Sequence, residues 1–250
     1  MKLALLADIH ANLQALQACL ADARRRGADQ YAFLGDLVGY GADPVAVLDI
    51  IADRAGAGAW VGRGNHDEAA LAPPAPAAGK ADPVAAAWTA AQLRAEHREF
   101  LAGLPLFVRH DFFVLVHASM REPRRWEYVQ DALTAAGSLG AAQDLGLTHV
   151  FGGHVHEQRL FFQGAVGKVM PFEPTAGVPV PLPRHRHWVA TVGSVGQPRD
   201  RRSEAMYALF DSDTLQLTFV RVHYDHEAAA QAIIDAGLPA FNASRLPRGE

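Results

Sequence analysis

The chain has 250 residues, half of them hydrophobic, with 23 basic and 27 acidic side chains and a formal charge of −4. This length and apolar content suffice for one α/β domain with a sizeable core, so we expect a single domain over residues 1–250. The slight negative charge provides no overall basic field, which argues against bulk attraction to nucleic acid or an anionic membrane. Any recognition of anions must therefore be local.

Cysteine content and the N-terminal sequence indicate where the protein resides. One cysteine, Cys19, excludes an internal disulfide and a cysteine-rich zinc site, which fits a reducing compartment. The apolar run in MKLALLADIH is interrupted by Asp8, too early for a signal-peptide core, and no other run approaches a membrane span. We expect a cytoplasmic protein without a membrane partner.

Continuous apolar runs recur along the chain and predict strands covered on both faces. They are residues 3–7, 31–34, 59–61, 112–116, 148–151 and 188–192. Between the first two, residues 11–26 carry leucines at helical spacing and end in three arginines before Gly27, as the end of a helix prefers. An α/β fold is predicted.

Two segments interrupt this alternation. Residues 69–83 are rich in Ala, Pro and Gly, and a helix from about 84 to 101 should follow, so that 69–104 forms a helical excursion. Residues 171–187 hold five prolines and indicate an inserted loop or hairpin tip. Near the end, residues 206–210 and 214–222 predict two strands, and a closing helix is expected over 227–236.

Polar side chains able to bind metal follow each of the first five apolar runs. They are Asp8, His10, Asp36, Asn65, His117, His154 and His156. Each alone has a simpler explanation as a helix cap, a turn residue or a core histidine. Because ligands bind outside the carboxyl ends of strands in open α/β sheets, however, the seven should converge on one crevice.

The chemistry of this set points to transition metals. Carboxylates, imidazoles and an amide without thiolate suit Mn²⁺, Fe, Zn²⁺, Co²⁺ or Ni²⁺, and the set is too rich in nitrogen for Ca²⁺ or Mg²⁺ alone. Seven ligands are too many for one ion with an open position. We therefore expect two divalent metal ions that share a carboxylate, with manganese favoured.

Five motifs, in this order, resemble those of the calcineurin-like metallophosphoesterases. They are Asp8-Ile-His10, Gly35-Asp36, Gly64-Asn65-His66-Asp67, Val116-His117 and Gly153-His154-Val155-His156. The sequence GSVGQPRD at 193–200 is similar to the small bacterial and archaeal phosphoesterase and phosphodiesterase branch. The resemblance covers nearly the whole chain and implies a four-layer α-β-β-α sandwich.

The resemblance also implies roles for individual residues. One metal would be bound by Asp8, His10, Asp36 and His156, and the other by Asp36, Asn65, His117 and His154. His66 would lie beside the leaving group, with Asp67 holding its ring. Protein serine/threonine phosphatases place an arginine where this chain has Gly39-Tyr40-Gly41, so that class is not matched.

Substrate contacts are less strongly indicated. Asn12 would either touch substrate or cap a helix, and Ser194 and Arg199 would either face an anion or form a tight turn. Trp126, Tyr128 and Trp188 would either wall a pocket for a base or belong to the core. Arginines that could attract nucleic acid (Arg121, Arg124, Arg125, Arg184, Arg186, Arg201 and Arg202) more often form a solvated surface or pair with acids.

We expect hydrolysis of phosphodiester or phosphomonoester bonds of a small or nucleotide-like substrate by a metal-bridging hydroxide. A dinucleoside-polyphosphate pyrophosphohydrolase shares the same metal motifs and is the alternative. A scaffold without catalysis is disfavoured because Asp36 and His66 are both present. The sequence leaves the oligomeric state open.

Overall fold

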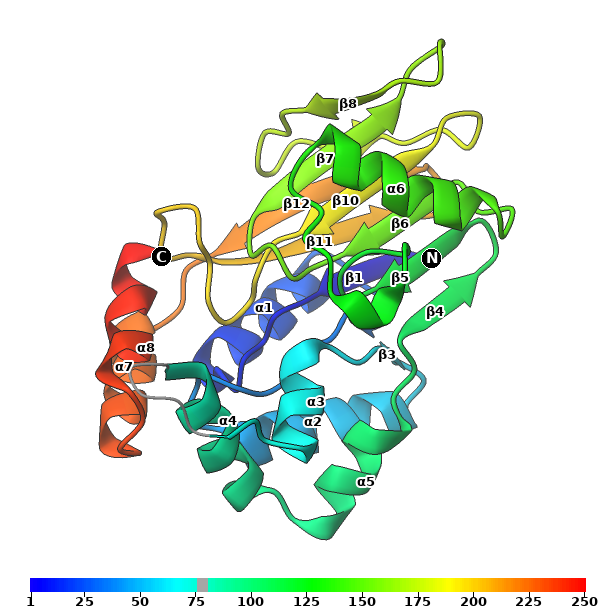
Figure 1. Ribbon diagram of the computed structural model, residues 1–250. Helices are drawn as coiled ribbons and strands as arrows, with labels where there is room; N and C mark the ends of the chain where they lie inside the picture. The colour runs from blue at the N-terminus through cyan, green and yellow to red at the C-terminus, as the bar shows by residue number, and fades with distance from the viewer. Residues whose placement is uncertain (76–80) are drawn as a thin grey trace.

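Two six-stranded sheets lie face to face between layers of helices in the computed structural model, which describes residues 1–75 and 81–250 (Figure 1). The first sheet has the order β3 (Trp60–Val61), β2 (Gln30–Phe33), β1 (Lys2–Leu6), β11 (Ala205–Asp211), β12 (Gln216–Val222) and β9 (Val180–Pro181). The second has the order β4 (Phe107–His110), β5 (Phe113–Val116), β6 (His149–Gly152), β10 (Trp188–Val192), β7 (Gln158–Gln163) and β8 (Val169–Phe172). The predicted α-β-β-α sandwich is confirmed.

Helices cover the outer face of each sheet. The first sheet packs against α1 (Leu13–Arg25) and α2 (Pro44–Gly56), and α6 (Ala132–Gln143) lies on the second (Figure 1). The remaining helices are α3 (Asn65–Leu71), α4 (Ala81–Gln92), α5 (Ala95–Gly103), η1 (Pro123–Arg125), α7 (His226–Asp235), α8 (Ala240–Arg245) and η2 (Leu246–Arg248). No helix of the described residues is both long enough and apolar enough to cross a lipid bilayer.

The burial of β1 explains the continuous apolar runs. Leu3 and Leu5 point into the core between the two sheets, where Phe113, Phe151 and Phe210 also pack. Successive side chains of a strand alternate between faces, so the residues between and after those leucines meet the helical layer instead. A strand covered on both faces has no solvent side, and this is why its sequence shows no polar alternation.

The region after β3 contains two helices where one was expected over residues 84–101. Helix α4 ends at Gln92 and α5 begins at Ala95, because Arg94 has an extended backbone (φ −73°, ψ 169°) and serves as the N-cap of α5. Leu93 is buried in the core beside α2, and the side chain of Arg94 pairs with Asp49 at 2.8 Å. The chain therefore turns here to keep contact with α2. Part of the predicted excursion, residues 76–80, lies outside the described residues.

Residues 171–187 form a connection between the sheets, whereas a loop or hairpin tip was expected. The segment begins inside β8, the edge strand of the second sheet, and continues to β9 at the edge of the first. Val180 and Pro181 pair with Leu217 and Gln216 of β12. The proline-rich segment thus closes one end of the sandwich.

Candidate metal centre

The seven predicted metal ligands follow the carboxyl ends of five strands, and five of the seven have left-handed backbone. Asp8, His10, Asp36, His154 and His156 have φ between 49° and 67°. This conformation is uncommon for residues other than glycine and persists only where the surrounding structure enforces it. Hydrogen bonds between the loops provide that enforcement, since the amide of Asp8 donates to Gly35 O at 3.1 Å and that of His10 to Asp36 O at 2.9 Å.

Glycines are required where the chain approaches the carboxylates of this centre. A Cβ on Gly153 would lie 2.5 Å from Asp8 Oδ2, and one on Gly64 would overlap the carboxylate of Asp36. A side chain at either position would displace a carboxylate from the centre. The glycine-rich motifs of the sequence therefore serve close approach as well as turning.

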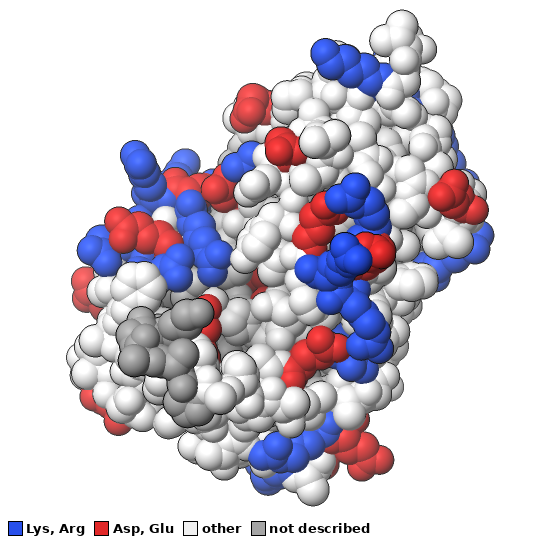
Figure 2. Space-filling model, viewed as in Figure 1, with Lys and Arg blue, Asp and Glu red and all other residues white. Residues whose placement is uncertain are grey.

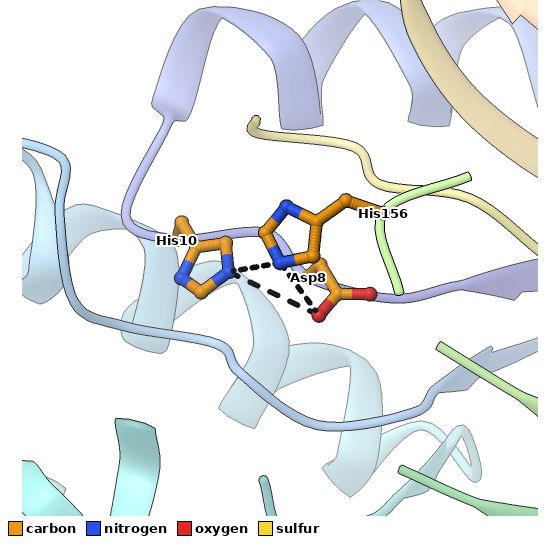
Figure 3. Close-up of side chains that lie close together, drawn as sticks. All are labelled: Asp8, His10 and His156. Carbon is orange, nitrogen blue, oxygen red and sulfur yellow. Dashed lines mark hydrogen bonds and ion pairs between the residues drawn. The ribbon is translucent and has the colours of Figure 1, made fainter. Parts of the chain in front are cut away.

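Asp8, His10 and His156 form the first of two buried groups, which we call the first group (Figure 3). His10 Nε2 lies 3.1 Å from His156 Nε2, and Asp8 Oδ1 lies 3.3 Å from His156 Nε2 and 3.9 Å from His10 Nε2. All three side chains are almost completely buried. They come from the loops after β1 and β6.

The hydrogen bonds on the outer side of the first group fit a bound cation. His10 Nδ1 is 3.3 Å from the carbonyl of Val38, and His156 Nδ1 is 2.5 Å from that of Gln197. A carbonyl only accepts, so each Nδ1 carries the proton and each Nε2 presents a lone pair. Two lone pairs thus face each other, and Asp8 Oδ1 beside them is buried without a hydrogen-bond partner among the described residues. A divalent metal ion would satisfy all three atoms.

Asp36, His117 and His154 form the second group. Three atoms lie 3.2 Å from His117 Nε2: Asp36 Oδ2, His154 Nδ1 and Asn65 Oδ1. His117 Nδ1 donates to the carbonyl of Leu34 at 2.9 Å. Asn65 therefore joins the second group, as the resemblance implied.

Asp36 lies between the two groups. Its Oδ2 is 3.2 Å from His117 Nε2 and 3.8 Å from His10 Nε2, whereas its Oδ1 accepts the backbone amide of His66 at 2.8 Å. Burial alone would raise the pKa of Asp36, but His117 and His66 hold that pKa well below its usual range. A charged carboxylate at this position can serve both groups.

The histidines of the two groups differ in their electrostatics. Burial lowers the pKa of His10 well below its usual value, and His156 beside it lowers it further. Burial and the neighbouring His117 lower the pKa of His154 to about 4. Burial opposes protonation of His117 as well, but the carboxylate of Asp36 outweighs it and raises the pKa to about 9. Neutral imidazoles are the form that binds metal.

His66 lies at the edge of the first group. Its ring centroid is 5.0 Å from that of His10 and 4.4 Å from that of Tyr40. Tyr40 in turn lies 4.6 Å from His10, so its ring contacts both histidines. Sequence reasoning missed Tyr40, although it stands within the glycine-rich motif of Asp36 and has a left-handed backbone (φ 63°).

Asp67 does not hold the ring of His66, contrary to expectation. Its buried carboxylate accepts the backbone amides of Leu37 at 2.9 Å, Val38 at 3.3 Å and Gly64 at 2.8 Å. The reason is its position three residues after Gly64, the N-cap of α3, where a carboxylate satisfies free amides. Burial and the nearby Asp36 raise the pKa of Asp67 to about 7. Asp67 thus joins the loop after β2 to α3.

Two of the three predicted substrate contacts have structural partners. Asn12 Oδ1 caps α1 by accepting the amide of Ala15 at 3.0 Å, and its Nδ2 donates to Gly196 O at 2.9 Å. The buried hydroxyl of Ser194 donates to Asp8 O and accepts the amide of Gln197, both at 2.8 Å. The expectation that these side chains contact substrate is therefore not supported. Both position the loop that carries Asp8.

Arg199 keeps a position close to the first group. Its backbone amide donates to His156 O at 3.1 Å, and its partly exposed side chain contacts Gln197 Oε1 at 3.1 Å. Among the three candidate aromatic walls, Trp188 is buried in the core between the sheets. The other two, Trp126 and Tyr128, lie against histidines of the second group.

Comparison with known proteins agrees with this architecture. A model of the calcineurin-like phosphoesterase family matches residues 1–158. The chain is 32% identical to an uncharacterized protein of Methanocaldococcus jannaschii, over 98% of this chain and 96% of that protein. The crystal structure of a metallophosphoesterase from Sphaerobacter thermophilus is 34% identical, with a TM-score of 0.86, and 100% of this chain and 99% of that one are covered.

A hypothetical protein from Pyrococcus horikoshii shares the fold at 22% identity and a TM-score of 0.79, with 100% of this chain and 98% of that one covered. The chain therefore belongs to the calcineurin-like phosphoesterase family. Membership defines the general reaction class as phosphoric ester hydrolysis and implies divalent metal ions, for which the structure offers two groups of ligands.

Proposed function

We propose that the protein is a dinuclear metal-dependent phosphoesterase that hydrolyses phosphodiester bonds, phosphomonoester bonds or both in small substrates. Asp8, His10, Asp36 and His156 would hold one ion, and Asn65, His117 and His154 would hold the other together with Asp36. The observation that carries the proposal is the position of Asp36 Oδ2, within 3.8 Å of a histidine nitrogen of each group. When bound, two such ions would supply Lewis acidity and would lower the pKa of a coordinated water molecule.

The residues around the two groups would orient and protonate the substrate. Among the described residues, His66 hydrogen-bonds to Asp36 through its backbone amide and not through its ring. The ring would therefore be available to donate a proton to the departing ester oxygen. Burial lowers the pKa of His66, while the carboxylate of Asp36 opposes this shift and helps the ring to carry a proton. The guanidinium of Arg199 would bind a non-bridging phosphoryl oxygen.

The donor set supports a transition metal, and we propose manganese as the native ion, with Fe, Zn²⁺, Co²⁺ or Ni²⁺ as substitutes. Five imidazole or amide donors accompany two carboxylates, and all ring nitrogens that face inward are positioned by partners on the outer side or by packing. Calcium and magnesium prefer sets made of oxygen. The ligand set would therefore distinguish transition metals from calcium and magnesium by the type of donor atom rather than by charge alone.

Removal and restoration of metal test this function. The protein would be stripped with chelator, and Mn²⁺, Fe²⁺, Co²⁺, Ni²⁺, Zn²⁺ or Mg²⁺ would be restored singly before assay with aryl phosphomonoester and phosphodiester substrates. We expect two ions per chain and activity that returns with manganese at least as well as with the other ions. Failure to bind metal, or full activity in the stripped protein, would overturn the proposal. The ratio of the two activities would rank monoester against diester.

A further inference from the structure

Residues 121–128, between β5 and α6, place two aromatic rings against the second group. The ring of Tyr128 stacks on His154 with centroids 4.0 Å apart and planes inclined by 28°. Trp126 meets the ring of His117 edge-on, with centroids 5.8 Å apart. Tyr128 is 46% exposed and Trp126 is partly exposed, so neither ring is part of a hydrophobic core cluster.

The segment that carries these rings is attached to the rest of the fold at both ends. Met120, directly before the segment, and Val129, directly after it, are both buried in the core beneath α6, and Arg121 pairs with Glu127 within the segment. Arg124 reaches across to Glu68 of α3 at 3.1 Å, and α3 is the helix that begins with Asn65 and His66. The two rings thus lie beside the residues that would perform the reaction.

The charges of the segment argue against a polyanionic ligand. Each of its three arginines is paired with a glutamate. The pairs are Arg121 with Glu127, Arg124 with Glu68, and Arg125 with Glu122. Figure 2 shows basic side chains on this face with acidic side chains directly beside them. Binding along a nucleic-acid backbone depends on free cations that displace counterions. The rings are therefore the feature of this segment that remains available to a ligand.

We propose that Trp126 and Tyr128 form a subsite that stacks the planar aromatic part of a small phosphoester, a nucleobase or an aryl ring, while its phosphate lies at the metal centre. This inference rests on the proposed function and adds the class of substrate to it. Stacking tolerates any flat ring, because every such ring presents a π face. It would favour aromatic over aliphatic esters by roughly tenfold for each ring that stacks.

The test compares an adenosine phosphoester with a glycerol phosphoester of the ester class that the protein hydrolyses. We expect Tyr128→Leu and Trp126→Leu each to lower the ratio of the two kcat/KM values by roughly tenfold, mainly through KM for adenosine. Tyr128→Phe should keep the ratio of the parent protein, because phenylalanine retains the aromatic ring. Phe172→Leu, which removes a similarly exposed ring from the edge strand β8, is the matched control and should leave the ratio unchanged.

Metal content of each variant separates stacking from packing against the ligands. The subsite is overturned if both leucine variants lose metal and their kcat/KM values fall equally for the two substrates. That result would mean that the rings only support His117 and His154. If no ester is hydrolysed by the metal-loaded protein, the proposed function fails, but calorimetry still tests the subsite. Adenosine monophosphate should then bind at least tenfold more tightly than glycerol phosphate in the parent protein, and each leucine variant should lower this preference by roughly tenfold; equal binding of the two ligands by the parent protein would refute the subsite.

Discussion

The first and second groups contain the same kinds of side chain but are held differently. In the first group both histidines donate an outer nitrogen to a backbone carbonyl, of Val38 and of Gln197. In the second group, within residues 1–75 and 81–250, only His117 has such a carbonyl. His154 Nε2 is buried there without a partner, and the His154 ring stacks against the partly exposed Tyr128. Backbone carbonyls thus position both histidines of the first group, whereas the partly exposed side chains of Asn65 and Tyr128 lie against the second.

A variant that breaks both groups at once should have the largest effect. Asp36→Asn removes the charge that the two groups share, and we expect activity to fall roughly 10³-fold or more, because two ions would lose a common carboxylate ligand. Metal analysis should show fewer than two ions per chain. Retention of both ions with near-normal activity would mean that Asp36 does not bridge the groups.

His66→Ala tests the residue that lies beside the first group without belonging to it. We expect kcat to fall by about 10²–10⁴-fold for esters with an alkyl leaving group, and by less for nitrophenyl esters, whose leaving group needs no proton. Metal content should stay at two ions per chain. An equal loss for both kinds of ester would show that the ring of His66 positions substrate rather than donating a proton.

The difference in support between the groups can be measured directly. Outer partners of metal-binding histidines typically contribute 10- to 100-fold in metal affinity. His156 has such a partner and His154 has none among the described residues. We therefore expect His156→Asn to weaken metal binding at the first group about tenfold more than His154→Asn weakens it at the second. Calorimetric titration of each variant with Mn²⁺ would determine both affinities. The reverse order would contradict the view that the backbone holds the first group more firmly.

His149 provides a comparison from outside the centre, because both of its ring nitrogens have partners in the protein. Its Nδ1 lies 2.8 Å from Thr148 Oγ1 and its Nε2 lies 2.9 Å from Leu182 O. Burial lowers the pKa of this ring to about 4. Between pH 6.5 and about 4 the unfolded chain therefore binds a proton that the folded chain does not, and stability falls as the pH is lowered.

His149→Leu should remove this dependence at a small cost in stability. As the pH falls through that window, the parent protein should lose free energy of unfolding relative to the variant by at most about 1.4 kcal/mol per pH unit, so that its small initial advantage disappears and then reverses. Urea titrations at several pH values, with metal saturating, would measure it. If the difference in the free energy of unfolding stays constant with pH, the His149 ring is protonated in the folded protein as it is in the unfolded chain. As a control, the parent and the variant should bind the same amount of metal.

Strands buried on both faces and residues at their ends were predicted from the sequence, because burial and chemistry leave clear patterns there. The run at 188–192 corresponds to β10 residue for residue, and all seven expected ligands lie in or between the two groups. Two half-buried strands at one side of the second sheet were missed, QRLFFQ of β7 and the edge strand VMPF of β8, because their apolar residues follow no simple period.

Side-chain partners that depend on the tertiary fold were not predictable. The sequence places Asp67 next to His66, but only the approach of the loop after β2 shows that its carboxylate binds Leu37, Val38 and Gly64. Ser194 likewise lies 186 residues from Asp8, whose carbonyl it binds. Helix α6 was missed because its two glycines and many alanines weaken the pattern. Such contacts join segments that no local pattern connects.

The pairing of β1 with β11 has a consequence for the synthesis of the protein. Leu3 is opposite Phe210, so the N-terminal strand obtains its partner on that side only when most of the chain has been made. At about 5–20 residues per second, the interval on the ribosome is roughly 10–40 s. During this time an apolar strand lacks a neighbour and is open to chaperones or to aggregation. Residues 1–158 alone would contain β1, β2 and β3 but lack β11, so a nascent or truncated chain of that length cannot complete the first sheet.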